Sequence, residues 1–250
     1  MISPRHHTVG MNLSETSFHT LPLAAAVLKR TLKTGRFSKA IVCSFGVREG
    51  IVHEQLSAQD KGRDPLLAGI AAVISLMPQR AAFGLKLARW VAQAARETLP
   101  ERLAETACMA ADIGADMHPD HRADIVFEQL STAPFAGLTH QERAALALAV
   151  ACRYSRGFRH DISEALLDGE TAAKSRALGA LMRLGAHFSG RSAPLLELAE
   201  LSAYGGVLHL EVARKNQNLV SDSVKKRLQQ AATIMGMEPQ LHLSGERVAL

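Results

Sequence analysis

A chain of 250 residues is long enough for one large domain or two small ones, and 47% hydrophobic with 21% charged residues predicts a packed core. No apolar run approaches the ~20 residues that are needed to cross a bilayer. The first ten residues carry Arg5, His6 and His7 and lack the apolar segment of a signal peptide. We therefore expect a cytoplasmic protein that does not enter a membrane. The net charge of +5 permits an anionic partner, but no long basic run is present, which argues against nucleic acid.

The first part of the chain has the pattern of a helix, a strand and a second helix. Pro22 suits a first helical turn, so a helix is expected over residues 22–32, with Gly35 as its end. Residues 40–43 form a short apolar run that is typical of a buried strand, and the chain then turns into a helix beginning at Val47. This order predicts the edge of an α/β domain.

Between Asp64 and Gly190 apolar residues recur three or four positions apart, which predicts helices only. Three of these helices are expected to carry a proline in the first turn, namely Pro65, Pro100 and Pro119. The expected helices cover residues 64–77, 81–97, 100–111, 119–130, 141–154 and 170–188. Together they predict a continuous helical bundle or array.

The last part of the chain mixes both types of element. Ser221 is a suitable cap for a helix, and Gly236 is a suitable end for the same helix. The expected elements are a helix over residues 194–204, a strand over 207–212, a helix over 224–235 and a strand over 240–243. They predict a small α/β cap.

The three cysteines, Cys43, Cys108 and Cys152, are widely spaced and lie in apolar stretches. We interpret them as reduced core residues rather than as metal ligands or a redox pair. The sequence contains no Gly-rich loop that could cradle phosphates.

Several segments together resemble one known family. Residues 44–50 read Ser-Phe-Gly-Val-Arg-Glu-Gly, which looks like the Ser-x-Gly-Leu/Val-Arg-Glu-Gly signature of the Ppx/GppA phosphatases, and residues 20–28 are similar to the helix before it. Residues 107–114 and 118–123 resemble a degenerate HD-type helix of the family, in an alphaproteobacterial style, and residues 143–150 match the helix that follows. The chain therefore resembles the carboxy-terminal half of an exopolyphosphatase.

This resemblance implies a mainly α fold in three parts. Residues 1–57 would be the tail of the second actin-like phosphatase lobe, residues 58–190 a degenerate HD-like helical domain, and residues 191–250 a small α/β domain. The family hydrolyses the terminal phosphate of inorganic polyphosphate, or the γ-phosphate of guanosine pentaphosphate, with a divalent cation such as Mg²⁺. The catalytic loops of the family have no counterpart in this sequence, so we expect the chain to bind polyphosphate and form dimer contacts without hydrolysis or a tightly bound cofactor.

Arg48 and Glu49 are the first candidates for phosphate contact. They lie at a turn into a helix between Gly46 and Gly50, where backbone amides and an arginine favour phosphate oxygens. A local Arg–Glu pair that fixes the turn is the alternative.

Asp112 stands where an HD-type phosphohydrolase has its His-Asp pair, but Ala111 replaces the histidine and Cys152 stands at a further histidine position. A working metal site needs several imidazole and carboxylate ligands, so we expect Asp112 to bond a helix end or a neighbouring side chain. His118 and His121 could share a metal at their spacing. The alternative reading is an ordinary helix start around Pro119 and Asp120.

Spaced basic residues are the candidates for holding a polyphosphate chain, because a polymer of negative charges is bound by several separated cations. An ordinary solvated surface is the alternative for each of them. The main candidates are Arg214, Lys215, Lys225, Lys226 and Arg227, and further basic residues in the helical part are Arg153, Arg156, Arg159 and Arg183.

Three functions therefore remain open. The first is an exopolyphosphatase-family protein that is limited to polyphosphate binding. The second is an HD-type metal-dependent phosphohydrolase acting on nucleotides, and the third is a helical interaction module without a phosphate ligand.

Overall fold

The computed structural model describes residues 15–41 and 45–248. The chain divides into two compact units, residues 1–55 and 56–250. It is mainly helical, with a small four-stranded mixed sheet near the carboxy terminus, which agrees with the expected fold class. Whether residues 58–190 and 191–250 are separate domains stays a prediction.

In the first unit the described residues form two helices, α1 (Glu15–Gly35) and α2 (Val47–Gln55). The expectation that Pro22 opens the first helix is wrong, because Pro22 lies inside α1 and costs it one backbone hydrogen bond. The start of α2 at Val47 is as expected. Residues 42 and 43 of the expected strand lie outside the described residues, and residues 40 and 41 have no regular structure.

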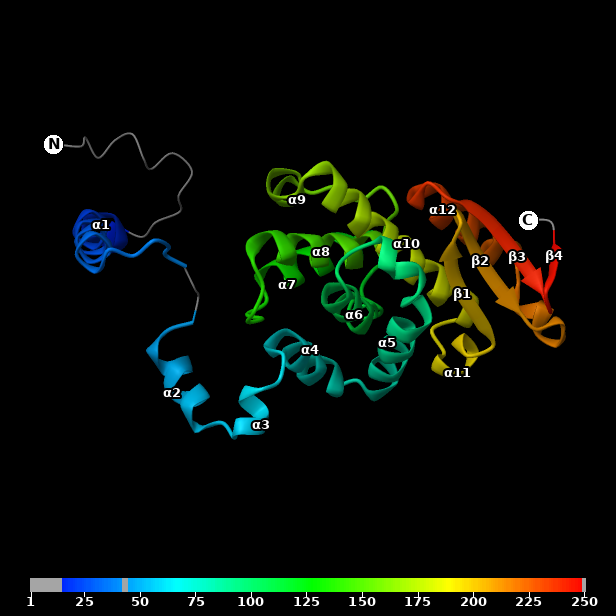
Figure 1. The fold of residues 1–250 in the computed structure, drawn as a ribbon, viewed down its shortest axis with the longest axis horizontal. Helices are drawn as coiled ribbons and strands as arrows, with labels where there is room; N and C mark the ends of the chain where they lie inside the picture. The colour runs from blue at the N-terminus through cyan, green and yellow to red at the C-terminus, as the bar shows by residue number, and fades with distance from the viewer. Residues whose placement is uncertain (1–14, 42–44, 249–250) are drawn as a thin grey trace. The chain divides into compact units, whose positions relative to one another are not determined.

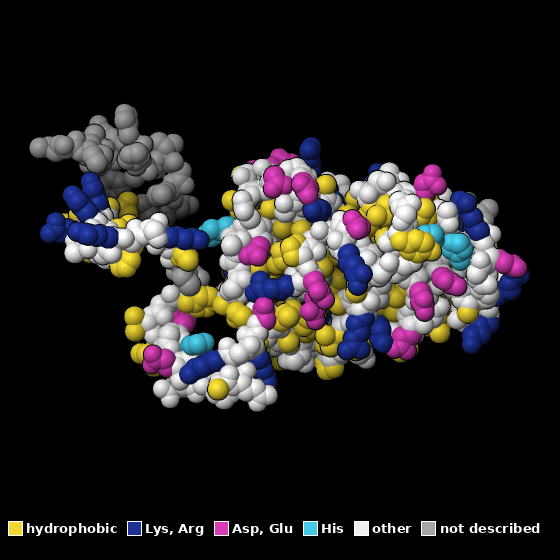
Figure 2. Space-filling view, in the orientation of Figure 1, with side chains coloured by type: hydrophobic (Ala, Val, Ile, Leu, Met, Phe, Trp, Pro, Cys, Tyr) yellow, Lys and Arg dark blue, Asp and Glu magenta, His cyan; other side chains and the backbone are white. Residues whose placement is uncertain are grey.

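The two helices of this unit carry exposed apolar side chains. Leu23 is 70% exposed, Val27 67%, and Val47 80%. Basic residues such as Lys29, Arg30 and Lys33 accompany them on α1, where Figure 2 shows dark-blue and yellow side chains side by side. An apolar surface of this kind is typical of a segment that is covered by something else.

The second unit is an array of helices followed by the sheet (Figure 1). Four of the six helices expected between Asp64 and Gly190 lie within two residues of their expected bounds, and the helix expected over residues 119–130 begins three residues later. The helix expected over residues 81–97 is wrong, because Pro78 opens a helix that ends at Val91 and a separate 3-10 helix covers residues 94–97. The short helices over residues 58–61 and 161–166 are additions. The helices are α3 (Ala58–Lys61), α4 (Pro65–Ser75), α5 (Pro78–Val91), η2 (Ala94–Glu97), α6 (Glu101–Met109), α7 (Arg122–Thr132), α8 (His140–Tyr154), α9 (Asp161–Leu166), α10 (Gly169–Ser189) and α11 (Ala193–Leu196).

Helix α8 is the centre of this unit, and it packs against α6, α7, α9 and α10. Ten consecutive residues, from Ala144 to Arg153, are buried, so the helix is covered on every side. Its start is fixed by a capping box, in which Glu142 N donates to Thr139 Oγ1 (3.1 Å) and Thr139 N donates to Glu142 Oε2 (2.8 Å). The alternation of alanine with larger residues lets neighbouring helices approach closely.

The sheet has the strand order β1-β2-β3-β4. Strands β1 (Ala199–Tyr204) and β2 (Val207–Val212) are antiparallel, β2 and β3 (Glu238–Leu243) are parallel, and β4 (Glu246–Val248) is antiparallel to β3. The crossover between the parallel strands runs through η3 (Arg214–Leu219) and α12 (Asp222–Met235). Helix α12 packs on the sheet through buried Val224 and Leu228.

The helices also hold the outer edge of β1. Trp90 Nε1 donates to the Ala199 carbonyl (2.8 Å). The Gln93 amide accepts from Ala203 N (2.6 Å) and donates to Ala203 O (3.3 Å). These side chains pair the backbone groups that an edge strand otherwise exposes, and they join the sheet to the same core as the helices.

Three further expectations are corrected. The expected helix over residues 194–204 is instead the short helix α11 and strand β1, because Ala199, Leu201 and Ala203 face the core with a period of two. Pro119 lies in a turn before α7, which begins at Arg122. Pro65 opens α4 as expected, whereas Pro100 is the N-cap of α6 rather than a residue of its first turn.

We predict that Gly179→Ala destabilises the second unit. A Cβ at Gly179 would lie 2.6 Å from the Ala149 carbonyl oxygen of α8, so the helices must move apart at a cost of roughly 1–3 kcal/mol. Urea unfolding followed by circular dichroism measures this loss. Gly169→Ala is the control, since nothing lies within 4 Å of its added Cβ, and equal stability of the two variants would contradict the prediction.

Candidate anion-binding site

The only buried residue pair of opposite charge in the described part of the chain joins Asp112 to Arg153. Asp112 lies in the turns after α6, and Arg153 lies near the end of α8. Both side chains are about 5% exposed, and Arg153 Nη2 donates to Asp112 Oδ1. Charges at such depth require a partner, so this bond fastens the turns after α6 to α8.

Tyr154 completes the same junction. Its hydroxyl donates to the Ala111 carbonyl (2.8 Å) and accepts from Gly114 N (3.2 Å). The Arg153 guanidinium carbon lies 4.5 Å from the centre of the Tyr154 ring, within the range of a cation–π contact. Burial raises the pKa of Tyr154, which keeps the hydroxyl protonated as a donor.

This environment does not suit a metal ion. The Asp112 carboxylate is bound by Arg153, and no three His, Cys, Asp or Glu side chains of the described residues gather as metal ligands. The Mg²⁺ implied by the family resemblance therefore has no matching ligand set in the described residues. The sequence expectation that Asp112 bonds a neighbouring side chain agrees with the structure, and the expected lack of bound metal stays a prediction.

Next to this junction, α10 and α12 present matching stripes to each other. Each stripe has the spacing i, i+4, i+7 and i+11, which places its four residues on one helical face. Six of the eight residues line a small crevice, together with Cys152 and Arg156 from the end of α8. The stripes are Arg176, Ala180, Arg183 and His187 on α10, and Ser223, Arg227, Gln230 and Ile234 on α12.

Four guanidinium groups line this crevice, and the buried Arg153 lies close enough for its charge to act on Arg183. We call them the arginine cluster, and its members are Arg153, Arg156, Arg176, Arg183 and Arg227. Burial, followed by the charges of Arg227, Arg153 and Arg156, lowers the pKa of Arg183. Neighbouring positive charges therefore act on Arg183 at close range.

The cluster has few acceptors within the protein. Arg176 Nη1 donates to the Phe158 carbonyl (2.6 Å), and Arg227 Nη1 donates to Gln230 Oε1 (2.7 Å). Among the described residues, no carboxylate lies within ion-pair distance of Arg156, Arg183 or Arg227. Arg227 Nε is buried and has no acceptor in the described part of the chain. An anion would supply what is missing.

The basic residues predicted around α12 do not form one patch. Arg227 faces the crevice with Gln230 and Ile234, whereas Lys226 is exposed on another side of the helix. Arg214 is paired with Glu246 of β4, and its backbone N–H donates to Ser244 Oγ (2.9 Å). Lys215 follows Arg214 on η3 and is exposed, and Lys225 is half-buried. Only Arg227 of the five joins the cluster.

Arg48 and Glu49 belong to the first unit, at the start of α2. The Glu49 carboxylate accepts from Gly46 N (2.6 Å), and this backbone hydrogen bond lowers the pKa of Glu49. Glu49 thus stabilises the turn into α2 through the Gly46 backbone N–H and not through the expected pair with Arg48, which is exposed beside it.

His118 and His121 lie in the turn before α7, and their ring centres are 5.7 Å apart. His118 Nδ1 accepts from Asp120 N (3.3 Å), and the side chains of His118 and Asp120 are mostly exposed. This local bond stabilises the turn before α7, so neither Pro119 nor Asp120 lies in a first helical turn as the alternative expected.

Cys108 and Cys152 are buried free thiols, and Cys43 lies outside the described residues. Burial raises the pKa of Cys152 to about 11. A thiol that is buried and stays protonated at neutral pH does not act as a reactive thiolate.

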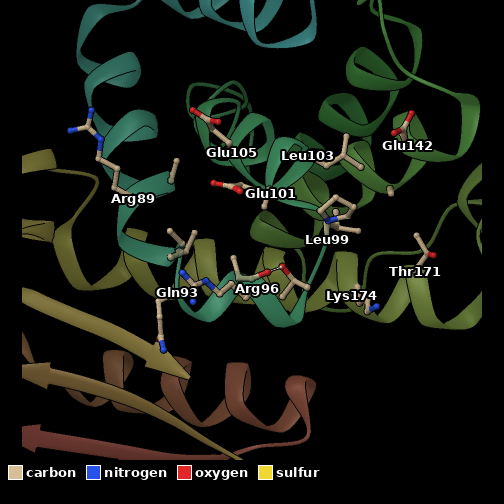
Figure 3. A pocket seen from close by; sticks show the side chains of 18 of the residues that line it. Arg89, Gln93, Arg96, Leu99, Glu101, Leu103, Glu105, Glu142, Thr171 and Lys174 are labelled. Carbon is tan, nitrogen blue, oxygen red and sulfur yellow. Dashed lines mark hydrogen bonds between the residues drawn. The ribbon is translucent and has the colours of Figure 1, made fainter. Parts of the chain in front are cut away.

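A larger pocket of about 1150 Å³ lies elsewhere in the second unit, between α5, η2, α6 and the starts of α8 and α10 (Figure 3). It is lined by both signs of charge. Arg89, Arg96 and Lys174 supply positive groups, while Glu101, Glu105 and Glu142 supply carboxylates. These carboxylates would repel a polyanion, so we do not place one here.

Sequence reasoning missed Arg176 and His187 as members of the site. The available signal was the spacing of Arg176, Arg183 and His187 on one predicted helix, which puts three positive or titratable groups on one face. Nothing in the sequence showed that α12 would present Arg227 to that face.

The family model described as exopolyphosphatase, C-terminal, matches residues 83–242. These residues include the Asp112–Arg153 pair and the whole arginine cluster. No curated protein matches the chain. None of the described helices has both the length and the apolar character needed to cross a membrane.

We predict that Asp112→Ala destabilises the second unit strongly, by about 3–5 kcal/mol, because it leaves a buried guanidinium without its carboxylate. The double variant Asp112→Ala/Arg153→Met should recover much of this loss, since it removes both charges. Urea unfolding measures both effects. Asp116→Ala is the control; its carboxylate pairs with Arg80 but is 80% exposed, so the loss should stay within about 1 kcal/mol. An equally mild effect of Asp112→Ala would contradict the prediction.

Proposed function

Because the chain belongs to the exopolyphosphatase C-terminal family, we propose that it binds inorganic polyphosphate and that the arginine cluster is a contact site for this chain. The observation that carries the proposal is the meeting of Arg156, Arg183 and Arg227 around one crevice without a carboxylate partner among the described residues. The family supplies the chemical class of the ligand.

The chemistry of the two partners is complementary. Each interior phosphate of a polyphosphate carries a negative charge and oxygen acceptors only, whereas guanidinium groups offer donors only. Hydrogen bonds between such charged groups are shorter and stronger than neutral ones. A bound phosphate would also lie among like charges and reduce their mutual repulsion.

A long polymer extends beyond a crevice of this size, so further cations can contribute along its path. Lys225 and Lys226 on α12, and Lys215 on η3, are the remaining candidates in the second unit, and Arg48 is the candidate in the first. Arg214 is a weaker candidate, since Glu246 already pairs with it. Spaced contacts of this kind favour long chains over short phosphates.

The alternative of a metal-dependent nucleotide phosphohydrolase has no supporting feature among the described residues, because Asp112 is bound to Arg153 and no ligand set is gathered. A helical interaction module without phosphate ligand is the outcome to accept if polyphosphate does not bind.

We also propose that the chain self-associates through the apolar residues of its first unit. Leu28 and Val27 of α1 are mostly exposed, and burying such side chains is favourable. Light scattering at micromolar concentration should show a dimer or a larger species, and Leu28→Lys should shift it towards monomer. Ala26→Lys adds the same charge two residues from Leu28, on the opposite face of α1, and should change nothing. A monomeric wild-type protein would refute this proposal.

We predict that Arg183→Gln/Arg227→Gln lowers the affinity for long-chain polyphosphate by about tenfold or more, because each hydrogen bond to a charged group contributes roughly 1.5–3 kcal/mol. Binding of the wild-type protein should weaken steeply as salt rises, and the variant should show a shallower dependence. Isothermal titration calorimetry at two salt concentrations measures both quantities.

The matched control is Lys225→Gln/Lys226→Gln, which removes the same amount of charge from α12 outside the crevice. It should retain most of the affinity. Equal losses in the two double variants would mean that net charge alone attracts the polymer, and unchanged affinity after the arginine substitutions would remove the cluster from the site.

A further inference from the structure

His187 stands at the end of the arginine cluster, where no function has been assigned to it. It follows Arg183 by one helical turn on the same face of α10. Its Nδ1 lies 3.3 Å from Ser223 Oγ at the start of α12. The residue is partly covered by its neighbours but exposed to solvent. It lies outside the crevice and one helical turn beyond Arg183, where a polymer that extends out of the crevice along α10 meets its imidazole.

The charges around His187 are all positive. Arg183 comes from α10 itself, Arg227 from α12 and Arg153 from α8. His187 lies in the last turn of α10. The carboxy-terminal end of a helix favours a cation, so the helix itself favours the protonated imidazole and opposes the effect of the arginines. Burial, then Arg227, Arg183 and Arg153, lowers the pKa of His187 below its ordinary value. The imidazole is therefore neutral near pH 7 while the site is empty.

We propose that His187 is a proton-linked member of the polyphosphate site, so that it contacts the bound polyanion as an imidazolium and binding takes up a proton at this residue. This inference rests on the proposed function of the arginine cluster. The charge of His187 would differ between the bound and the empty state, whereas the arginines are charged in both states.

The direction of the pH effect follows from linkage. A bound polyanion stabilises the imidazolium, so it raises the pKa of His187 above the lowered value of the empty site. Affinity must then increase as pH falls through the interval between the two pKa values. A difference of one pKa unit corresponds to about a tenfold gain. Above the pKa of the bound state the affinity no longer depends on this residue.

The test uses the full chain and long-chain polyphosphate as the probe, because its interior phosphates stay ionised over the whole range. Titration calorimetry at pH 8 and pH 5.5 gives the ratio of affinities, and buffers of different ionisation enthalpy give the number of protons taken up. The wild-type protein should bind several-fold more tightly at the lower pH and take up protons. His187→Gln should show a smaller ratio and a smaller uptake.

His140→Gln is the matched control. His140 is the first residue of α8, at the opposite end of that helix from Arg153, and it is exposed. For His140→Gln, the ratio of the affinities at the two pH values and the proton uptake should equal those of the wild-type protein. Because all variants bind the same polymer, this comparison also corrects for the titration of the polymer's terminal groups. Nuclear magnetic resonance of the His187 ring gives a direct second measurement, a pKa that rises when polyphosphate is added.

The outcomes separate the two proposals. If the wild-type protein binds polyphosphate but His187→Gln keeps the same ratio and uptake, or the His187 pKa does not rise, this inference is wrong and the proposed function stands. If the wild-type protein binds no polyphosphate at either pH, both proposals are wrong.

Discussion

Arg153 is a charged residue in the most deeply buried helix of the second unit, and the arrangement of that unit follows from how its charge is compensated. Helix α8 is covered on all sides, so solvent does not reach the guanidinium. Its carboxylate partner, Asp112, comes from the turns after α6. The same turns bond the neighbouring Tyr154 through Ala111 and Gly114. Because the pair must meet, α6 and α8 have a single register relative to each other.

Close packing around α8 explains why the other arginines lie near one another despite their charge. Gly179 lets α10 approach the backbone of α8, and this contact fixes the face of α10 that carries Arg176 and Arg183. Helix α12 is held in turn by the sheet and by α10. Apolar burial of this extent outweighs the repulsion between a few partly solvated guanidinium groups. Packing thus holds the positive charges together in the empty site, which is the arrangement that an anion-binding site needs.

Local signals in the sequence predicted much of the fold, whereas contacts between segments that are distant in the sequence could not be predicted from it. Helix α12 was predictable because Ser221 caps it and Gly236 ends it in the left-handed conformation, and β2 was predictable from its alternation. Strand β1 was mistaken for a helix because its period-two pattern is short, and its pairing with β2 and with Gln93 decides its structure. The site was less predictable still. Arg227 was chosen for its place in a basic run, but its role depends on the crevice that α8 and α10 form with α12.

The positive charge around the Asp112–Arg153 pair distinguishes this region from the metal site of an HD-type enzyme and agrees with the proposed polyphosphate ligand. In an HD-type site, carboxylates and imidazoles gather to hold a metal cation. Here Asp112, the one buried carboxylate among residues 19–41 and 45–248, is bound by Arg153, a cation of the chain itself. Beside this pair, burial and then the guanidinium charges of Arg227, Arg153 and Arg156 lower the pKa of Arg183. The local field therefore attracts an anion where a metal site would attract a cation, which supports the proposed polyphosphate site.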